Sequence, residues 1–171
     1  DEKINFPSAN WVIRDITVDN VNYFYMYNYQ DGLWQTGSPV YDVTFENIKA
    51  SSVSHAFYIA DEKSQASVTL KNCTFSGLAW KESIPAVFEG IPLQSEGFFY
   101  SQNVRSIDMN QVTFSWNGND ETFVCNGANK VKLYALLIIN KTSNKPLLFR
   151  NIDRISAKNV LINGVSSVFY E

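Results

Sequence analysis

The stretch Val43-Thr-Phe-Glu-Asn-Ile48 carries the pattern that decides the fold, because six ungapped copies of it occur along the chain. The copies begin at residues 16, 43, 68, 107, 131 and 155, so successive starts are 27, 25, 39, 24 and 24 residues apart. Repeats at such intervals are typical of solenoid proteins, in which each repeat buries its apolar face against its neighbours. The longest interval contains Pro85, Gly90 and Pro92 and predicts an inserted loop over about residues 78–100.

Within each copy, the first three residues alternate between apolar and polar, as in a strand with one buried face. The next apolar residue comes three positions later, so the chain must bend at the fifth position to keep that residue inside. Asparagine suits the bend because it tolerates the left-handed backbone region better than most residues. The predicted bend residues are Asn20, Asn47, Asn72, Gln111 and Asn159, with Ala135 interrupting the series. We expect their side chains to form a buried hydrogen-bonded ladder.

A third strand follows each copy, and the whole pattern predicts an all-β fold. The predicted third strands are Phe24–Met26, Phe57–Ile59, Ala86–Phe88, Phe123–Cys125, Leu147–Phe149 and Val168–Tyr170. We therefore predict a right-handed parallel β-helix of about six coils. It forms a single domain over residues 1–171, either complete or part of a longer β-helix protein. A β-sandwich is the alternative, but antiparallel strands would not keep one aligned signature.

This register makes a specific prediction about the core. The segments 43–48 and 68–73 should pair in parallel. The residues expected to be buried are Val43, Phe45, Ile48, Val68, Leu70, Ile107, Met109, Val112, Val131 and Leu133.

Composition excludes several classes of function. A net charge of −3 and a pI near 5.2 leave no electrostatic footprint for nucleic acid. No apolar stretch approaches the roughly 18 residues that a membrane span needs. With His55 as the only histidine and Cys73 and Cys125 as the only cysteines, the sequence indicates neither a zinc site nor a Ser-His-Asp triad, and we expect no metal or cofactor. The two cysteines should be either buried thiols or a disulfide.

An aromatic cluster near the N-terminus is the candidate for carbohydrate binding. If Phe24 and Met26 face inward, the four alternating tyrosines form an outward face that can stack on sugar rings. The candidate residues are Tyr23, Tyr25, Tyr27, Tyr29 and Trp34. Alternatively, an inserted loop or a partner chain covers this face.

The same register predicts an outward apolar ridge, with one residue from each third strand. Its members are Tyr25, Tyr58, Val87, Val124, Leu148 and Phe169. We expect either the inserted loop, through residues such as Leu78, Trp80, Phe98 and Phe99, or another molecule to cover the ridge. If the molecule that covers the ridge is another copy of the chain, the protein is a homo-oligomer. Alternatively, the ridge is covered by the remainder of a longer chain of which these residues are a part.

Four carboxylates are the candidates for catalysis, because glycoside hydrolysis needs two acidic groups roughly 5 to 9.5 Å apart. They are Asp31, Asp61, Glu62 and Glu89, which end or follow predicted third strands. The alternative is that they are solvated turn residues. The tripeptides that begin at Asn72 and Asn140 also match the glycosylation acceptor pattern, and we expect Asn140 to be the accessible one.

With these repeats, the chain resembles the pectin-lyase-like superfamily of right-handed β-helices. Three segments are similar to the carboxy-terminal coils of polygalacturonase-like proteins: Tyr41–Ile48, Val104–Trp116 and Leu147–Ile152. The resemblance covers roughly residues 10–171 and implies a secreted or cell-surface protein that acts on or binds acidic or neutral polysaccharide.

The catalytic motifs of that superfamily are missing from this sequence. Polygalacturonases carry Asn-Thr-Asp, Asp-Asp, Gly-His-Gly and Arg-Ile-Lys motifs, and none occurs here. We therefore expect a polysaccharide-associated module, the non-catalytic distal part of a larger carbohydrate-active protein whose ligand is a pectin-like polysaccharide. The alternatives are a divergent hydrolase or lyase that uses carboxylates, and a structural or adhesive solenoid such as a surface protein or a tail-spike fragment.

Overall fold

The structure is a computed structural model that describes residues 9–29, 41–77, 87–88, 91–92 and 97–167. These residues form thirteen β-strands and no helix. The strands are β1 (Trp11–Asp19), β2 (Tyr23–Tyr29), β3 (Val43–Val53), β4 (His55–Asp61), β5 (Ser67–Gly77), β6 (Val87–Phe88), β7 (Ile91–Pro92), β8 (Gly97–Ser115), β9 (Glu121–Ile139), β10 (Leu147–Ile152), β11 (Ile155–Lys158), β12 (Leu161–Ile162) and β13 (Val165–Ser166).

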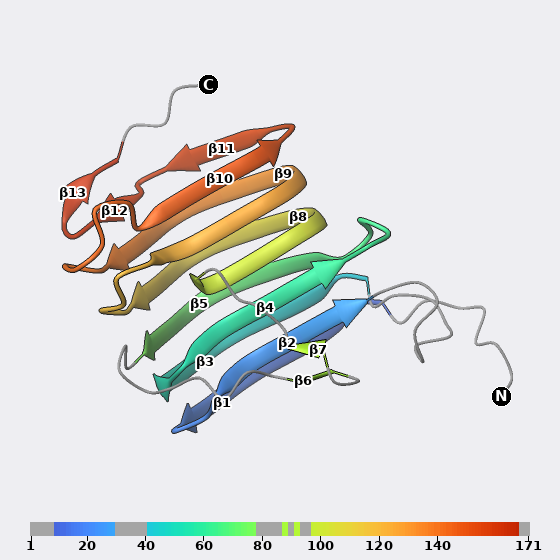
Figure 1. The fold of residues 1–171 in the computed structure, drawn as a ribbon, viewed down its shortest axis with the longest axis horizontal. Coiled ribbons are helices and arrows are strands. Elements are labelled where there is room, and N and C mark those ends of the chain that lie inside the picture. Colours follow the sequence, from blue (N-terminus) through green and yellow to red (C-terminus); the bar gives the residue numbers. More distant parts are fainter. Residues whose placement is uncertain (1–8, 30–40, 78–86, 89–90, 93–96, 168–171) are drawn as a thin grey trace, which may run out of the picture.

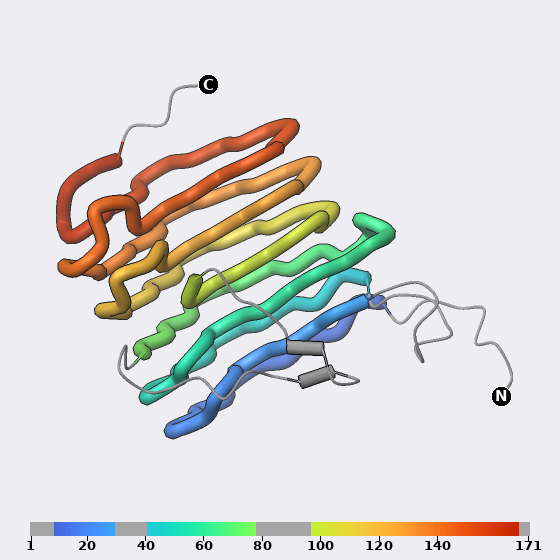
Figure 2. Tube along the Cα trace, in the orientation of Figure 1, coloured from blue at the N-terminus to red at the C-terminus, as the bar shows by residue number. Residues whose placement is uncertain are grey.

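Two stacks of parallel strands face each other (Figures 1 and 2). The first, the β1 stack, runs through β1, β3, β5, β8 and β9 and continues with β11 and β12. The second, the β2 stack, runs through β2, β4, β8, β9 and β10. β8 and β9 belong to both stacks because they bend at Asn103 and Gly127, where φ is 51° and 87°. As predicted, the fold is all-β with a mostly parallel sheet that does not close, which is compatible with a β-helix or another solenoid.

The core lies between the stacks and is rich in phenylalanine. The ring centroids of Phe57 and Phe75, one from each stack, are 5.1 Å apart, and Phe99 stacks on Phe123 of the next strand at 4.5 Å. All ten residues predicted to be buried are at most 4% exposed, and β3 pairs with β5 in parallel, so both core predictions are confirmed. Cys73 and Cys125 are buried free thiols, and burial raises the pKa of Cys125 to about 11.

The predicted bend also exists, with one correction at its N-terminal end. Asn47, Asn72, Gln111, Ala135 and Asn159 all have a φ between 52° and 57°. Asn72 donates a hydrogen bond to Asn47 at 2.9 Å, and Asn47 donates to Asp15 at 2.9 Å.

Asp15, not Asn20, therefore ends the ladder, although Asn20 also has the positive φ of a bend residue, 60°. β1 aligns with β3 from Trp11 opposite Val43, so the first copy begins at residue 11 and not at residue 16. The ladder is also exposed, not buried as expected, since Asn47 and Asn72 lie on the outer surface.

The third strands differ from the prediction at one of the five copies that the structure describes, while the predicted strand Val168–Tyr170 lies outside the described residues. The segment that lies between β4 and β9 is the first half of β8, with Phe99 opposite both Phe57 and Phe123, and not the predicted Ala86–Phe88. Val87 instead belongs to β6, which pairs with β7 in an antiparallel two-stranded sheet. Phe98 and Phe99 are therefore core residues of a strand and do not belong to the inserted loop.

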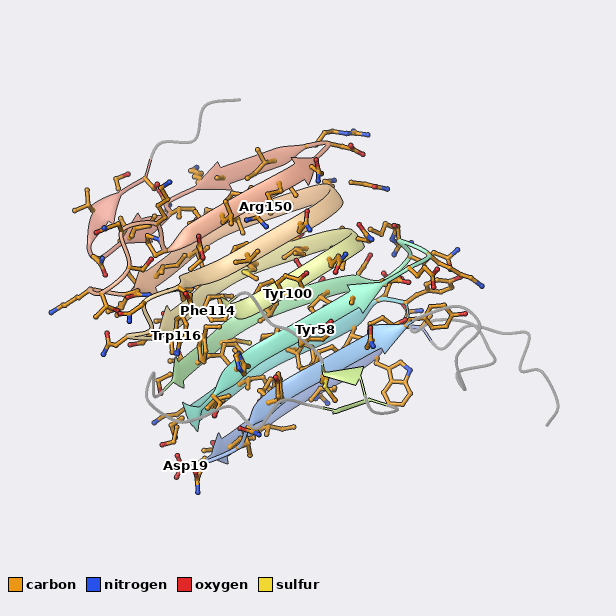
Figure 3. All side chains as sticks on the ribbon, in the orientation of Figure 1. Asp19, Tyr58, Tyr100, Phe114, Trp116 and Arg150 are labelled. Atoms are coloured by element: carbon orange, nitrogen blue, oxygen red, sulfur yellow. The ribbon has the colours of Figure 1, made fainter. Side chains whose placement is uncertain are left out.

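The outward row of the β2 stack consequently has a different composition. Its members are Met26, Tyr58, Tyr100, Val124 and Leu148, so Met26 replaces Tyr25 and Tyr100 replaces Val87. Tyr58 and Tyr100 lie side by side with ring centroids 5.4 Å apart (Figure 3). Tyr58, Tyr100 and Val124 are at most 6% exposed, and Phe169 lies outside the described residues.

Candidate functional site

The prediction that the N-terminal tyrosines share one outward face is wrong. Tyr25 lies opposite Phe57, and its ring centroid is 5.0 Å from that of Phe45, so Tyr25 points into the core. Burial raises the pKa of Tyr25 to about 12. Phe24 also packs into the core, so two successive residues face inward and the alternation changes phase. Met26, which was expected inside, is 46% exposed.

The other members of that candidate site are separated as well. Tyr27 packs against the core, and Tyr29 is buried. Tyr23 stacks on His55, with ring centroids 4.9 Å apart and planes 18° from parallel. Trp34 lies outside the described residues.

His55 occupies a structural position at the start of β4. Its Nδ1 lies 3.2 Å from the carbonyl oxygen of Gly97, the first residue of β8. Burial lowers the pKa of His55, and the hydrogen bond to Gly97 opposes that shift in part. The imidazole thus joins two neighbouring strands of the β2 stack.

Asp61 is a buried turn residue whose carboxylate is bonded to the backbone. Its oxygens accept hydrogen bonds of 2.6 to 3.0 Å from the N–H groups of Lys63, Gln65 and Ala66. The neighbouring candidate Glu62 is exposed on the same turn. Asp31 and Glu89 lie outside the described residues. The arrangement of Asp61 stabilises the turn between β4 and β5.

Asn140 is a buried hydrogen-bonding centre, contrary to the expectation that it is accessible. Its amide nitrogen donates to the Gly118 carbonyl and to Thr122, and its side-chain oxygen accepts from the N–H groups of Thr142 and Ser143. Asn140 is fully buried, whereas Asn72, in the other acceptor tripeptide, is exposed.

A cationic surface on β9 and β11 is the arrangement best suited to hold a ligand. In the register of these two neighbouring strands, Lys130 precedes the pair Val131–Ile155, and Lys158 lies opposite Tyr134. The cationic surface consists of five exposed residues: Lys130, Lys132, Tyr134, Arg154 and Lys158. Tyr134 is 46% exposed and lies two residues from Lys132 on the same face of β9.

The positive charge of this surface is largely uncompensated. Lys132 lies 3.8 Å from Asp108, but within the described ranges no carboxylate lies at ion-pair distance from Lys130, Arg154 or Lys158. Farther along the same outward row, by contrast, Lys71 pairs with Glu46 at 2.9 Å. Positive potential is therefore concentrated at the C-terminal end of the β1 stack.

A hollow of about 540 Å³ adjoins the cationic surface. Its apolar lining comes from Val131, Ile152 and Ile155, and its polar lining from Lys130, Asp153, Arg154 and Ser156. A concave site with an apolar floor and a few charged groups at its rim can hold one or two rings of a polar ligand. We call this the C-terminal hollow.

Sequence reasoning missed Tyr134, although the repeat contains a signal for it. Tyr134 occupies the fourth position of its copy, where the aligned copies carry the polar residues Glu46, Lys71, Asn110 and Lys158. This position faces outward, so an aromatic residue there cannot serve the core. An exposed aromatic ring at a polar repeat position is the feature that distinguishes this copy.

Comparisons with known proteins add no relative: no protein family, no curated protein and no solved structure matches the chain. In the described part of the chain, no group of three or more His, Cys, Asp or Glu side chains is placed to hold a metal ion. The same residues include no helix that is long and apolar enough to cross a membrane.

Proposed function

We propose that the chain is a polysaccharide-associated module, a right-handed parallel β-helix of about six coils that binds an anionic polysaccharide on the cationic surface. Six aligned bend positions support the number of coils. The right-handed sense is that of nearly all connections between parallel strands of one sheet. The module is the non-catalytic part of a secreted or cell-surface protein.

The observation that carries this proposal is the exposed ring of Tyr134 among cations on a regular surface. An aromatic ring offers a flat apolar face to the C–H face of a sugar. Lys132 and Lys158 flank that ring on the same outward surface, where ammonium groups can pair with the carboxylates of uronic acid units. A polymer also suits a surface that extends over more than one strand.

The proposal assigns the chain no catalytic role, and it is supported by Asp61, one of the two acidic candidates that the structure describes. Hydrolysis requires one carboxylic acid held protonated and a second carboxylate across the scissile bond. Asp61 is buried, and its carboxylate already accepts three backbone hydrogen bonds, which fix it in the turn and away from a substrate. Asp61 is therefore unsuited to act as a general acid.

Affinity electrophoresis tests the proposal, with polygalacturonate or a neutral glucan cast into a native gel. We expect polygalacturonate to retard the chain, and we expect Tyr134→Ala and the double variant Lys132→Gln/Lys158→Gln to remove most of the retardation. Added salt should weaken binding, because exposed charges are screened within about 10 Å at 0.1 M.

Lys49→Gln is the matched control, since Lys49 is an exposed lysine on β3 of the same stack but lies outside the cationic surface. Equal loss of retardation in this control would mean that net charge alone determines binding. Migration unchanged by either polysaccharide would refute the proposed function.

A further inference from the structure

In the described part of the chain, both ends of the two stacks present strand edges with no neighbouring strand, except at β12, which pairs with β13. Among the described residues, β1 and β2 pair only with β3 and β4, while β10 and β11 pair only with β9. Figure 1 shows these two ends on opposite sides of the molecule. Unpaired parallel edges are templates for adding another strand, including a strand from a second copy.

The two ends match in shape along one row of the register. Trp11 heads the row that continues through Val43, Val68, Ile107, Val131 and Ile155. Trp11 is 54% exposed, and the row ends at Ile155 in the C-terminal hollow. A second copy that continues the stack in register therefore places the indole of its Trp11 over this hollow.

The two ends also match in charge. Residues 11–29, which contain β1 and β2, carry one Arg against two Asp, a net charge of −1, whereas residues 147–158, which contain β10 and β11, carry three Lys and Arg against one Asp, a net charge of +2. Figure 3 shows Asp19 at the β1 end and Arg150 toward the other end. Head-to-tail contact thus brings opposite charges together, while contact between two like ends is repelled.

The bend ladder offers a specific hydrogen bond across the same junction. Asp15 ends the ladder with a carboxylate that can only accept hydrogen bonds. Asn159, at the other end, lies next to Ala135, which has no polar side chain to bond with it. In the continued register the Asn159 amide can donate to Asp15 of the next copy.

The β12–β13 hairpin occupies part of this junction. β13 pairs with β12 in an antiparallel manner on the edge away from β9, with Val165 opposite Ile162. In a continued stack, Thr17 and Val18 of the next copy would need that same edge, because their row leads to Leu161 and Ile162. The hairpin and a second copy therefore exclude each other.

We propose that the β12–β13 hairpin is a cap that prevents head-to-tail association of the chain with a second copy of itself. The turn of the hairpin is anchored to the preceding loop: its residues Asn163 and Gly164 have a φ of 51° and 82°, and the Asn163 side chain makes two hydrogen bonds with the backbone of Asn140. By keeping another copy away, the hairpin leaves the C-terminal hollow open to solvent.

The test is to open the hairpin in the chain of residues 1–171 and measure the molar mass by sedimentation equilibrium. Gly164→Val forces a β-branched residue into a positive φ, and Ser167→Pro removes the hydrogen bond of 2.9 Å that the Ser167 N–H donates to the Val160 carbonyl. A Cβ at position 164 would meet no atom within 4 Å, so that change acts on the backbone alone.

We expect the wild-type chain to remain at its monomer mass of 19.4 kDa, whereas the mass of the double variant rises with concentration without levelling off at a dimer. An open-ended increase follows because a head-to-tail contact does not close on itself. Adding Trp11→Glu should restore the monomer, and adding Arg14→Glu should strengthen association, since Arg14 faces Lys158 in the continued register.

Three results would overturn the proposal: a double variant that stays monomeric, association that Trp11→Glu leaves unchanged, or a wild-type chain that associates as strongly as the double variant. Wild-type association would show that the hairpin is no cap, even if the ends are complementary. None of these outcomes bears on polysaccharide binding, which the gel assay measures separately.

Discussion

At the scale of single residues, the polar groups that matter most are those that fix turns. Asp61 receives three backbone hydrogen bonds in the turn after β4, and Asn140 organises the connection between β9 and β10. Hydrogen bonds to a charged acceptor contribute more than neutral ones, and a buried donor without a partner is costly. These two residues therefore hold the loops that return the chain from one stack to the other.

Replacing Asp61 tests this role directly. We expect Asp61→Ala to lower the free energy of unfolding by about 3 kcal/mol, because it leaves three backbone donors without their acceptor. For a chain of this size, that loss corresponds to a melting temperature lower by roughly 6 to 12 °C. Glu62→Gln on the same turn is the control and should change stability by less than about 0.5 kcal/mol. Equal melting of the two variants would contradict the structural role of Asp61.

His55 should make stability depend on pH in the mildly acidic range. Burial lowers its pKa in the folded chain below the ordinary value of 6.5, so the unfolded chain binds a proton first as the pH falls. The stabilising contribution of neutral His55 is therefore complete above pH 6.5 and decreases as the pH falls from 6.5 toward the folded-state pKa. His55→Phe keeps a ring against Tyr23 without titrating, so its urea midpoint should vary less over this range. A His55→Phe variant with the wild-type pH profile would assign the effect to other groups.

At the scale of strands, the bends that join the two stacks are held by backbone geometry. Gly127 and Gly164 have nearly the same φ, 87° and 82°, but a Cβ at Gly127 would lie 2.7 Å from the Asn103 side-chain oxygen, while one at Gly164 would touch nothing within 4 Å. The first glycine bends a central strand, and the second lies at the edge of the sheet.

The two glycines make a matched pair of substitutions. We expect Gly127→Ala to cost about 2 to 3 kcal/mol in unfolding free energy, from the strained φ and the close contact together. Gly164→Ala should cost only about 1 kcal/mol, and mainly in the local opening of β13. Thermal melts of both variants measure the two losses. A lower melting temperature for Gly164→Ala than for Gly127→Ala would contradict the prediction.

Strand-level features also show how far sequence reasoning could reach. The repeat predicted the parallel register from β3 onward, because five copies share the apolar alternation and a bend at the fifth position, where three of them have asparagine. It misplaced the first copy because Ile16–Val21 also fits the pattern, while the true bend residue there is Asp15, which tolerates a positive φ almost as well as asparagine.

Two other errors have local physical causes. The tyrosine face failed because Phe24 and Tyr25 both point inward at the start of β2, which breaks the two-residue period. The β12–β13 hairpin was missed although Asn163-Gly164 is a strong turn signal, because each flanking strand has only two residues. Predicting the cationic surface would have required the register between β9 and β11, since Lys130 and Arg154 are neighbours only across strands.

At the scale of the whole molecule, a single core lies between the two stacks along their length. It contains groups that titrate only at high pH. Tyr25 near one end has a pKa of about 12, and Cys125 toward the other has a pKa of about 11, both raised by burial. In the unfolded chain these groups lose their protons at lower pH. Stability should therefore fall as the pH rises.

Tyr25→Phe isolates one part of that effect. Between pH 10 and about 12, the folded chain retains the phenol proton that the unfolded chain has lost, so wild-type stability should decrease by about 2 to 3 kcal/mol across this interval. The variant should show a correspondingly smaller decrease in denaturant midpoint. If both chains lose stability in parallel, Tyr25 does not contribute, and the thiols or surface lysines must account for the loss.

The continuous strands β8 and β9 also determine the order in which the chain comes apart. They pair along nearly their whole length, from Gly97 opposite Glu121 to Ser115 opposite Ile139, and each pair is only 24 residues apart in sequence. Closing so short a connection costs little chain entropy, so this pair can form early and open last. β1 and β13, each held on one edge only, should fray first. Amide protons should therefore exchange slowest near Phe99–Phe114 and progressively faster toward both ends, so that the molecule unravels from its ends and not all at once.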